Sequence, residues 1–139
     1  MRSSRFYLLM VAALAAGLPT TLWSESRSDF FGVWTGTVTE VVVAGSHYSN
    51  YEVSISLVPG DYSVDYPTLG CGGRLRLLEQ RGRQVRFRDE LGYGFDACSN
   101  GGRTELRLVG PNLGAYLWFD AEGHLRAEGV LKRRRQIVT

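Results

Sequence analysis

Two cysteines are the residues of this chain with the widest choice of chemistry. Cys71 and Cys98 lie in glycine-rich stretches, CGG and FDACSNGG, 27 positions apart. A nucleophilic thiolate needs a base and a redox pair needs a C-x-x-C motif, and neither is present. A zinc site needs about four ligands at compact spacing, whereas His47 and His124 each stand alone. The sequence therefore predicts a Cys71–Cys98 disulfide, with no metal and no cofactor.

Four arginines alternate with apolar residues in two neighbouring runs: Arg74, Arg76, Arg86 and Arg88. The runs RLRLLEQ and QVRFRDE predict a hairpin with Gln80-Arg81-Gly82 as its loop. Pairing Leu77 with Val85 would then set Arg76 opposite Arg86 and Arg74 opposite Arg88.

Like charges placed directly opposite each other destabilise a sheet unless neighbours neutralise them. Asp65 and Glu105 are the acids expected to do so. The alternative is an anionic contact surface for lipopolysaccharide, a membrane face, a glycan or an acidic protein. Aromatic side chains do not interleave with these arginines, so nucleic-acid binding is not expected.

Aromatic residues are the second set of candidates for ligand or partner contact. This set comprises Trp34, Tyr66, Tyr93, Phe95 and Trp118. Tyr66 and Tyr93 flank the two cysteines and are expected in loops, where they are the better placed for contact. The alternative is that the aromatics fill a small core, because an eight-stranded barrel has little spare volume.

Catalytic motifs are not visible in the sequence. It contains no G-x-S-x-G, no H-E-x-x-H and no glycine-rich phosphate loop that opens a helix. The carboxylates of Asp61, Asp65 and the Asp89-Glu90 pair are expected to be solvated charges at strand ends. An enzyme is therefore not expected.

The first 24 residues are typical of a secretory signal peptide. Arg2 and Arg5 precede an apolar run from Phe6 to about Leu18, which is shorter than the roughly 20 residues of a membrane span. The whole chain has 16 basic and 14 acidic residues, and removal of Arg2 and Arg5 leaves 14 of each. The basic excess is thus a targeting feature, and we expect an exported protein, periplasmic or secreted, without a transmembrane segment in its mature form.

The rest of the chain reads as short alternating runs separated by turn signals, which predicts an all-β fold. The predicted strands are 31–42, 51–57, 62–66, 74–80, 84–90, 103–109, 115–120 and 124–132. Short connections favour an antiparallel meander, and closure into an eight-stranded barrel would remove the exposed sheet edges. A two-sheet sandwich is the alternative. We expect one domain over 28–133 and a basic tail over 134–139.

Two resemblances concern specific residues. Gly32-Val33-Trp34, with Lys132 and Arg133 near the end of the last strand, is similar to the lipocalin-like (calycin) pattern, in which an early tryptophan packs under a late basic side chain. The combination of G-x-W-x-G, Y-P-x-L-x-C-G-G-x-L-x-L-L over 66–78, Cys98 and Gly129-Val130-Leu131 resembles a group of small bacterial extracytoplasmic β-domains. Members of that group occur alone behind signal peptides or attached to membrane-anchored serine/threonine kinases. This resemblance implies an exported sensor-like or binding module and no reaction.

These observations together predict an exported, non-enzymatic binding module for a cell-envelope component or a protein partner. A lipocalin-like carrier of a small apolar ligand is the first alternative. An inhibitor or immunity-type protein, which would present a loop from 43–50 or 91–102, is the second.

Overall fold

The computed structural model describes residues 27–41 and 49–134. These residues form one short 3₁₀ helix and eight strands. They are η1 (Arg27–Phe30), β1 (Gly32–Glu40), β2 (Asn50–Val58), β3 (Asp61–Tyr66), β4 (Cys71–Arg81), β5 (Gln84–Tyr93), β6 (Arg103–Gly110), β7 (Leu113–Phe119) and β8 (Leu125–Arg134). The predicted signal peptide, residues 43–48 of the candidate loop 43–50 with His47 among them, and residues 135–139 of the predicted tail lie outside the described residues. Arg134 belongs to β8.

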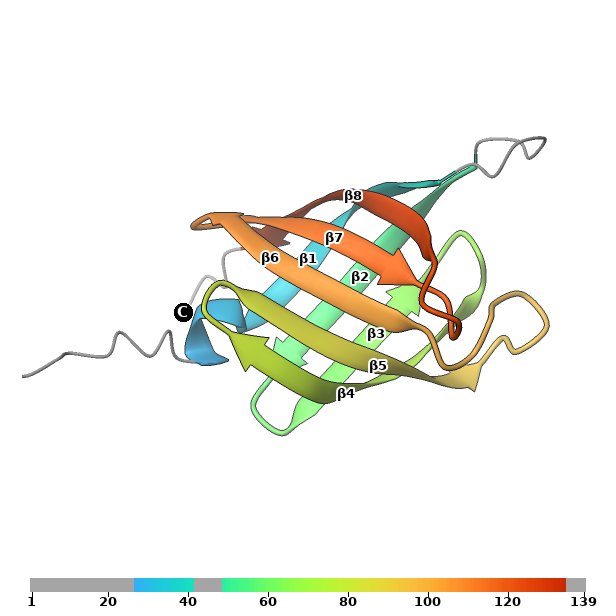
Figure 1. Ribbon diagram of the computed structural model, residues 1–139, viewed down its shortest axis with the longest axis horizontal. Helices are drawn as coiled ribbons and strands as arrows, with labels where there is room; N and C mark the ends of the chain where they lie inside the picture. Colours follow the sequence, from blue (N-terminus) through green and yellow to red (C-terminus); the bar gives the residue numbers. More distant parts are fainter. Residues whose placement is uncertain (1–26, 42–48, 135–139) are drawn as a thin grey trace, which may run out of the picture.

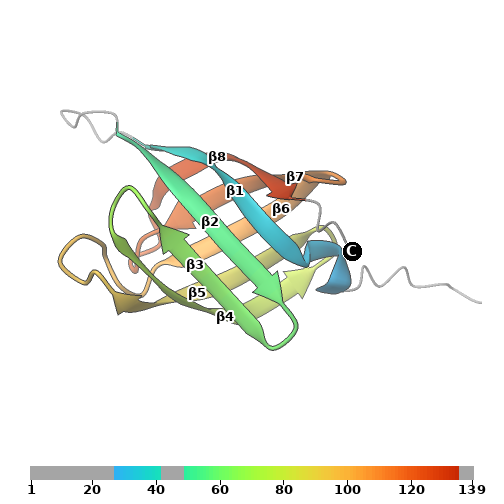
Figure 2. The same cartoon turned by 180° about the vertical axis from the view of Figure 1, so that it is seen from behind.

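The strands form a closed antiparallel barrel in chain order (Figure 1). Each strand pairs with the next, and β8 pairs with β1 to complete the ring. The view from behind shows β1, β2 and β3 forming the opposite wall (Figure 2). The predicted meander barrel is confirmed, and the sandwich alternative is wrong. Among the described residues, no helix has the length and apolar character needed to cross a membrane.

Alternation along the strands fills the interior of the barrel. On β2, Tyr51, Val53, Ile55 and Leu57 are all buried, as the period of two predicts. Trp34, Phe87, Leu106, Tyr116 and Leu131 extend this core from other strands. The barrel is therefore packed with side chains over most of its length.

One end of the barrel, which we call the helix end, is closed by η1. The Trp34 indole nitrogen donates a 2.8 Å hydrogen bond to the Phe30 carbonyl oxygen, and the Phe30 side chain is 3% exposed. The Arg133 guanidinium lies 4.7 Å from the centre of the Trp34 ring. It also donates to the backbone oxygens of Asp29, Phe31 and Pro111. Of the two basic residues in the calycin-like pattern, Arg133 covers the tryptophan, while Lys132 is exposed.

The predicted register of the β4–β5 hairpin is wrong by two residues. Leu77 lies opposite Phe87 rather than Val85, and the turn contains two residues, Gly82 and Arg83. The cause is a bulge between Leu77 and Glu79, which leaves Leu78 outside the ladder and 41% exposed. Because a shift of two preserves the faces, the predicted inward residues still point into the core.

Candidate functional site

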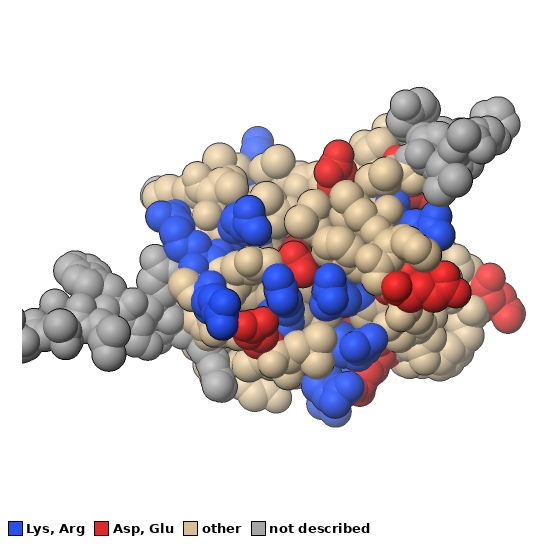
Figure 3. Space-filling view, viewed as in Figure 1, with Lys and Arg blue, Asp and Glu red and all other residues tan. Residues whose placement is uncertain are grey.

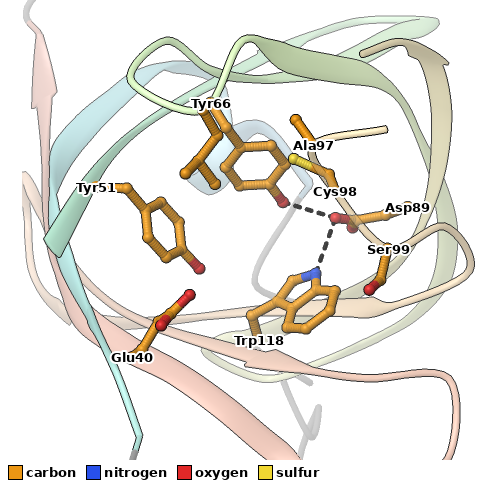
Figure 4. A pocket seen from close by; sticks show the side chains of 9 residues that line it. Glu40, Tyr51, Tyr66, Asp89, Ala97, Cys98, Ser99 and Trp118 are labelled. Atoms are coloured by element: carbon orange, nitrogen blue, oxygen red, sulfur yellow. Dashed lines mark hydrogen bonds between the residues drawn. The ribbon is translucent and has the colours of Figure 1, made fainter. Parts of the chain in front are cut away.

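A pocket opens at the other end of the barrel, which we call the pocket end (Figure 4). It has a volume of about 150 Å³. Its walls come from five strands and two connections, since residues 67–70 and 94–102 cross this end. The lining residues are Glu40, Tyr51, Tyr66, Leu69, Asp89, Ala97, Cys98, Ser99 and Trp118.

A buried carboxylate, Asp89, forms the floor of this pocket. Its side chain is only 2% exposed. One carboxylate oxygen accepts hydrogen bonds from the Tyr66 hydroxyl at 2.6 Å and from the Trp118 indole nitrogen at 3.0 Å. The other accepts from the Thr104 hydroxyl at 2.7 Å. Three other strands thus direct polar groups onto one aspartate of β5.

Burial raises the pKa of the Asp89 carboxyl above its ordinary range, because the charged form loses its hydration. The hydrogen bonds from Tyr66, Thr104 and Trp118 act in the opposite direction, since they favour the carboxylate. No ion pair to Asp89 occurs among residues 27–41 and 49–134. The charge of Arg88 also favours the carboxylate, so the pocket floor holds a carboxyl group with three hydrogen-bond donors and, in this part of the chain, no ion pair.

The buried tyrosines around Asp89 stay protonated. Burial raises the pKa of the Tyr66 and Tyr116 hydroxyls well above the ordinary range, and the Asp89 charge adds to this effect. Burial also raises the pKa of Tyr51, with Glu40 and Asp89 contributing. These hydroxyls can donate hydrogen bonds, and none is activated as a nucleophile.

The position of Trp118 depends on a glycine. A Cβ at Gly102 would lie 2.5 Å from Cε2 of the indole, which is too close for any side chain. The Gly102 carbonyl oxygen also accepts a 2.8 Å hydrogen bond from the Asp89 backbone nitrogen. The absence of a side chain at Gly102 therefore leaves the space that the Trp118 indole occupies when it reaches the carboxylate.

The predicted disulfide is present and ties the rim of the pocket. Cys71 begins β4 and Cys98 lies in the β5–β6 connection, with 6.3 Å between their Cα atoms. Gly94, at φ 70°, passes so close that a Cβ there would lie 2.7 Å from the Cβ of Cys71. The bond joins the open end of the β4–β5 hairpin to the segment that covers the pocket.

The five predicted aromatic contacts divide into three groups. Tyr66 and Trp118 line the pocket. Trp34 is fully buried at the helix end and is part of the core. Tyr93 and Phe95 lie outside the pocket, 46% and 60% exposed, and the Tyr93 hydroxyl donates to the Asp65 carboxylate. Neither Tyr66 nor Tyr93 is in a loop as predicted, because Tyr66 ends β3 with its ring 5% exposed and Tyr93 ends β5.

The expectation that Asp89 is a solvated charge at a strand end is wrong, because its side chain is buried. The signal was present in the sequence: Asp89 has the same parity as the inward residues Val85 and Phe87. Glu40 likewise has the parity of Trp34 and Val38. Alternation places both on the inward face, where Asp89 is buried and Glu40 is exposed at the rim; for Asp89 the charge was taken as evidence of exposure.

The arginine surface on β4 and β5 is largely neutralised. Arg76 pairs with Glu90 at 2.9 Å, and Arg86 pairs with Glu105 at 3.0 Å. Arg88 donates to the Gly101 carbonyl oxygen at 2.8 Å. In the part of the chain that the structure describes, Arg74 has no ion pair. Acidic side chains accordingly lie among the basic ones on this face (Figure 3).

Of the two acids predicted to neutralise the arginines, Asp65 and Glu105, only Glu105 does so. Glu105 takes the role predicted for it and also pairs with Arg103 at 3.4 Å. Asp65 does not, because it accepts the Tyr93 hydroxyl. The predicted Arg76–Arg86 and Arg74–Arg88 oppositions are replaced by Arg76–Arg88 and Arg74–Glu90.

An exposed group of Asp120, Glu122 and His124 brings three potential metal ligands within 4.8 Å of one another. Both carboxylate oxygens of Asp120 are already used. One accepts the backbone nitrogens of Glu122 and His124, and the other accepts the Arg126 guanidinium at 2.7 Å. This arrangement serves to shape the β7–β8 turn.

Comparison with known proteins gives neither a matching family model nor a matching curated protein. The site is therefore interpreted from its geometry.

Proposed function

We propose that this chain is an exported, non-enzymatic binding domain that holds a group of its ligand in the pocket at the pocket end of the barrel. The observation that carries the proposal is the pocket itself. It is concave, contains a buried ionisable group and is lined by aromatic and polar side chains, as ligand sites usually are. The ligand would be a cell-envelope component or a group presented by a protein partner.

Export is supported by the disulfide together with the signal-like sequence of residues 1–24. Disulfides persist mainly in oxidising compartments, and small exported domains often depend on them. The extracytoplasmic β-domain resemblance favours the same location.

The non-enzymatic part of the proposal is supported by the state of the polar groups. Both Asp89 oxygens are held by donors, and the pKa values of Tyr51 and Tyr66 are raised, which keeps their hydroxyls protonated. A nucleophile paired with a base is not found among residues 27–41 and 49–134. This arrangement fixes a charge and does not activate a reacting group.

The alternatives are less well supported. A carrier needs a cavity of roughly 300 Å³ or more, about twice the volume of the pocket at the pocket end. An apolar ligand in this pocket would also leave the carboxylates of Glu40 and Asp89 unsolvated. The inhibitor alternative draws support from the β5–β6 connection, which extends beyond the strands (Figure 1) and exposes Phe95. Because this connection also borders the pocket, Tyr93 and Phe95 remain predicted partner contacts under either reading.

Affinity capture from an envelope extract tests the proposal when a pocket-blocked variant is included. Ala97 is exposed and lines the pocket, so Ala97→Trp should fill the opening without entering the core. Val109→Trp is the matched control, because Val109 is 55% exposed on β6 towards the helix end. We expect the wild type and Val109→Trp to retain the same ligand and Ala97→Trp to lose it. Equal retention by all three would show that binding takes place elsewhere.

A further inference from the structure

The pocket is lined by two acids and by no base. Glu40 stands at its rim and Asp89 at its floor. Neither Glu40 nor Asp89 forms an ion pair in the described part of the chain. Burial raises the pKa of Asp89, although its three hydrogen bonds and the charge of Arg88 favour the carboxylate. A positive charge placed between the two would supply the missing partner.

Three aromatic rings form the side walls between these acids. Tyr51, Tyr66 and Trp118 face the cavity from β2, β3 and β7 (Figure 4). The rings of Tyr51 and Tyr66 meet edge to face, with 5.9 Å between their centres. Aromatic faces attract cations, and rings arranged around a cavity are the usual recognition site for organic ammonium groups.

The Tyr51 hydroxyl is a further polar group that the pocket offers to a ligand. The Tyr51 side chain is 7% exposed, and its hydroxyl is directed into the pocket towards Glu40 (Figure 4). Within residues 27–41 and 49–134 this hydroxyl makes no hydrogen bond. Because the oxygen opens onto the pocket, it is available to accept a hydrogen bond from a ligand donor.

The size and composition of the pocket restrict the cation. A volume of about 150 Å³ holds a group of only a few heavy atoms. A divalent metal such as Ca²⁺ requires six to eight oxygen ligands, and rings occupy most of these walls. An ammonium group instead uses both carboxylates and rings, because its N–H donors or methyl groups can face either.

We propose that the pocket binds a small organic ammonium group, held between Glu40 and Asp89 and enclosed by Tyr51, Tyr66 and Trp118. This inference rests on the proposed function and names the chemistry of its ligand. The ammonium belongs either to a free amine or to the end of a lysine side chain.

The test is calorimetric titration of the folded chain with probes that differ in charge. Tetramethylammonium and tert-butanol have similar shapes and differ in charge, and acetate supplies the opposite charge. Propylammonium represents a free amine, and Nα-acetyl-lysine amide represents a chain-borne one. Glu40→Gln removes the rim charge, while Glu52→Gln removes an exposed charge on the outer face of β2 and serves as control.

We expect the ammonium probes to bind and tert-butanol and acetate to bind at least tenfold more weakly. Glu40→Gln should weaken ammonium binding about three- to tenfold, as for loss of one typical hydrogen bond, and Glu52→Gln should leave it unchanged. Tighter binding of the lysine probe than of propylammonium would assign a chain-borne source, and the reverse order a free amine.

Three results would contradict the inference, and they differ in what they leave of the proposed function. Equal binding of tert-butanol and tetramethylammonium, blocked by Ala97→Trp, would overturn the ammonium assignment and leave the pocket as the binding site. Loss of ligand capture by Ala97→Trp with no ammonium binding would do the same. Absence of binding by every probe, together with unchanged capture by Ala97→Trp, would overturn both the inference and the proposed function.

Discussion

The Asp89 carboxylate both holds the strands together at the pocket end and positions side chains of the proposed binding site. Three donors from three other strands converge on it, so it fixes the relative positions of β3, β5, β6 and β7. The same contacts align Tyr66 and Trp118 as walls of the pocket. A single side chain therefore contributes to both stability and site geometry.

Asp89→Asn should destabilise the barrel by about 1–3 kcal/mol, because an amide nitrogen would face a donor and leave a buried polar group without a partner. Urea unfolding followed by circular dichroism measures the loss. Asp96→Asn is the matched control, since Asp96 is exposed and should change stability by no more than about 0.5 kcal/mol. Equal stability of the two variants would show that the network around Asp89 contributes little.

Asp89 and Asp120 should change the stability of the folded chain with pH in opposite directions. Burial raises the pKa of Asp89 above 3.8, so the folded chain binds more protons than the unfolded chain there, and stability falls as pH rises from 3.8 through the raised pKa. The hydrogen bond from Arg126 lowers the pKa of Asp120 to about 2, so its contribution is present above pH 3.8 and lost as pH falls towards 2.

Thermal unfolding from about pH 2 to pH 7 separates these two effects. Asp89→Asn should lack the decrease on the alkaline side of pH 3.8, and Asp120→Asn should lack the loss on the acid side. If both variants keep the wild-type profile, other groups set the pH dependence.

Among the elements, η1 and the end of β8 depend on each other through Arg133. Arg133→Ala should cost about 2–3 kcal/mol, because it removes charged hydrogen bonds to backbone oxygens and the contact with the Trp34 ring. Lys132→Ala, at the adjacent exposed position, should be near neutral. Chemical denaturation of both variants measures the difference, and a similar effect of the two would remove the special role of Arg133.

The Cys71–Cys98 bond joins β4 to the β5–β6 connection across 27 positions. Replacement of both cysteines by serine should lower stability by about 3–4 kcal/mol, because the unfolded chain regains the entropy of the open loop. Denaturant unfolding of this variant and of the wild type gives the value. Unchanged stability, or two free thiols by mass spectrometry of the protein purified without reductant, would contradict a structural bond.

At the scale of the whole molecule, much of the architecture was predictable because it depends on a period of two. Alternation in YEVSISL identified β2 and its buried face, and short connections with turn residues predicted the meander. The β4–β5 register was missed because of the bulge at Leu78, although the Leu77-Leu78 pair interrupts the alternation of RLRLLEQ at that position. The same bulge shifts the turn, so that it contains Gly82 and Arg83.

The site was predictable only in part. Tyr66 and Trp118 were identified from their type, whereas Glu40, Asp89 and Tyr51 were not assigned to a site. The five pocket side chains come from five strands, and only closure of the barrel brings them together. Parity indicated that each points inward, but it cannot show which inward residues share one end.

The two tryptophans at opposite ends of the barrel allow the central claim to be tested in one sample. The Trp118 indole N–H faces the pocket, and the Trp34 indole N–H lies at the helix end. We propose a titration of the ¹⁵N-labelled chain with propylammonium, with Trp118 assigned through Trp118→Phe. The account predicts a saturable shift of the Trp118 indole resonance and an unchanged Trp34 resonance. A shift of Trp34 alone, or no shift of either, would contradict it.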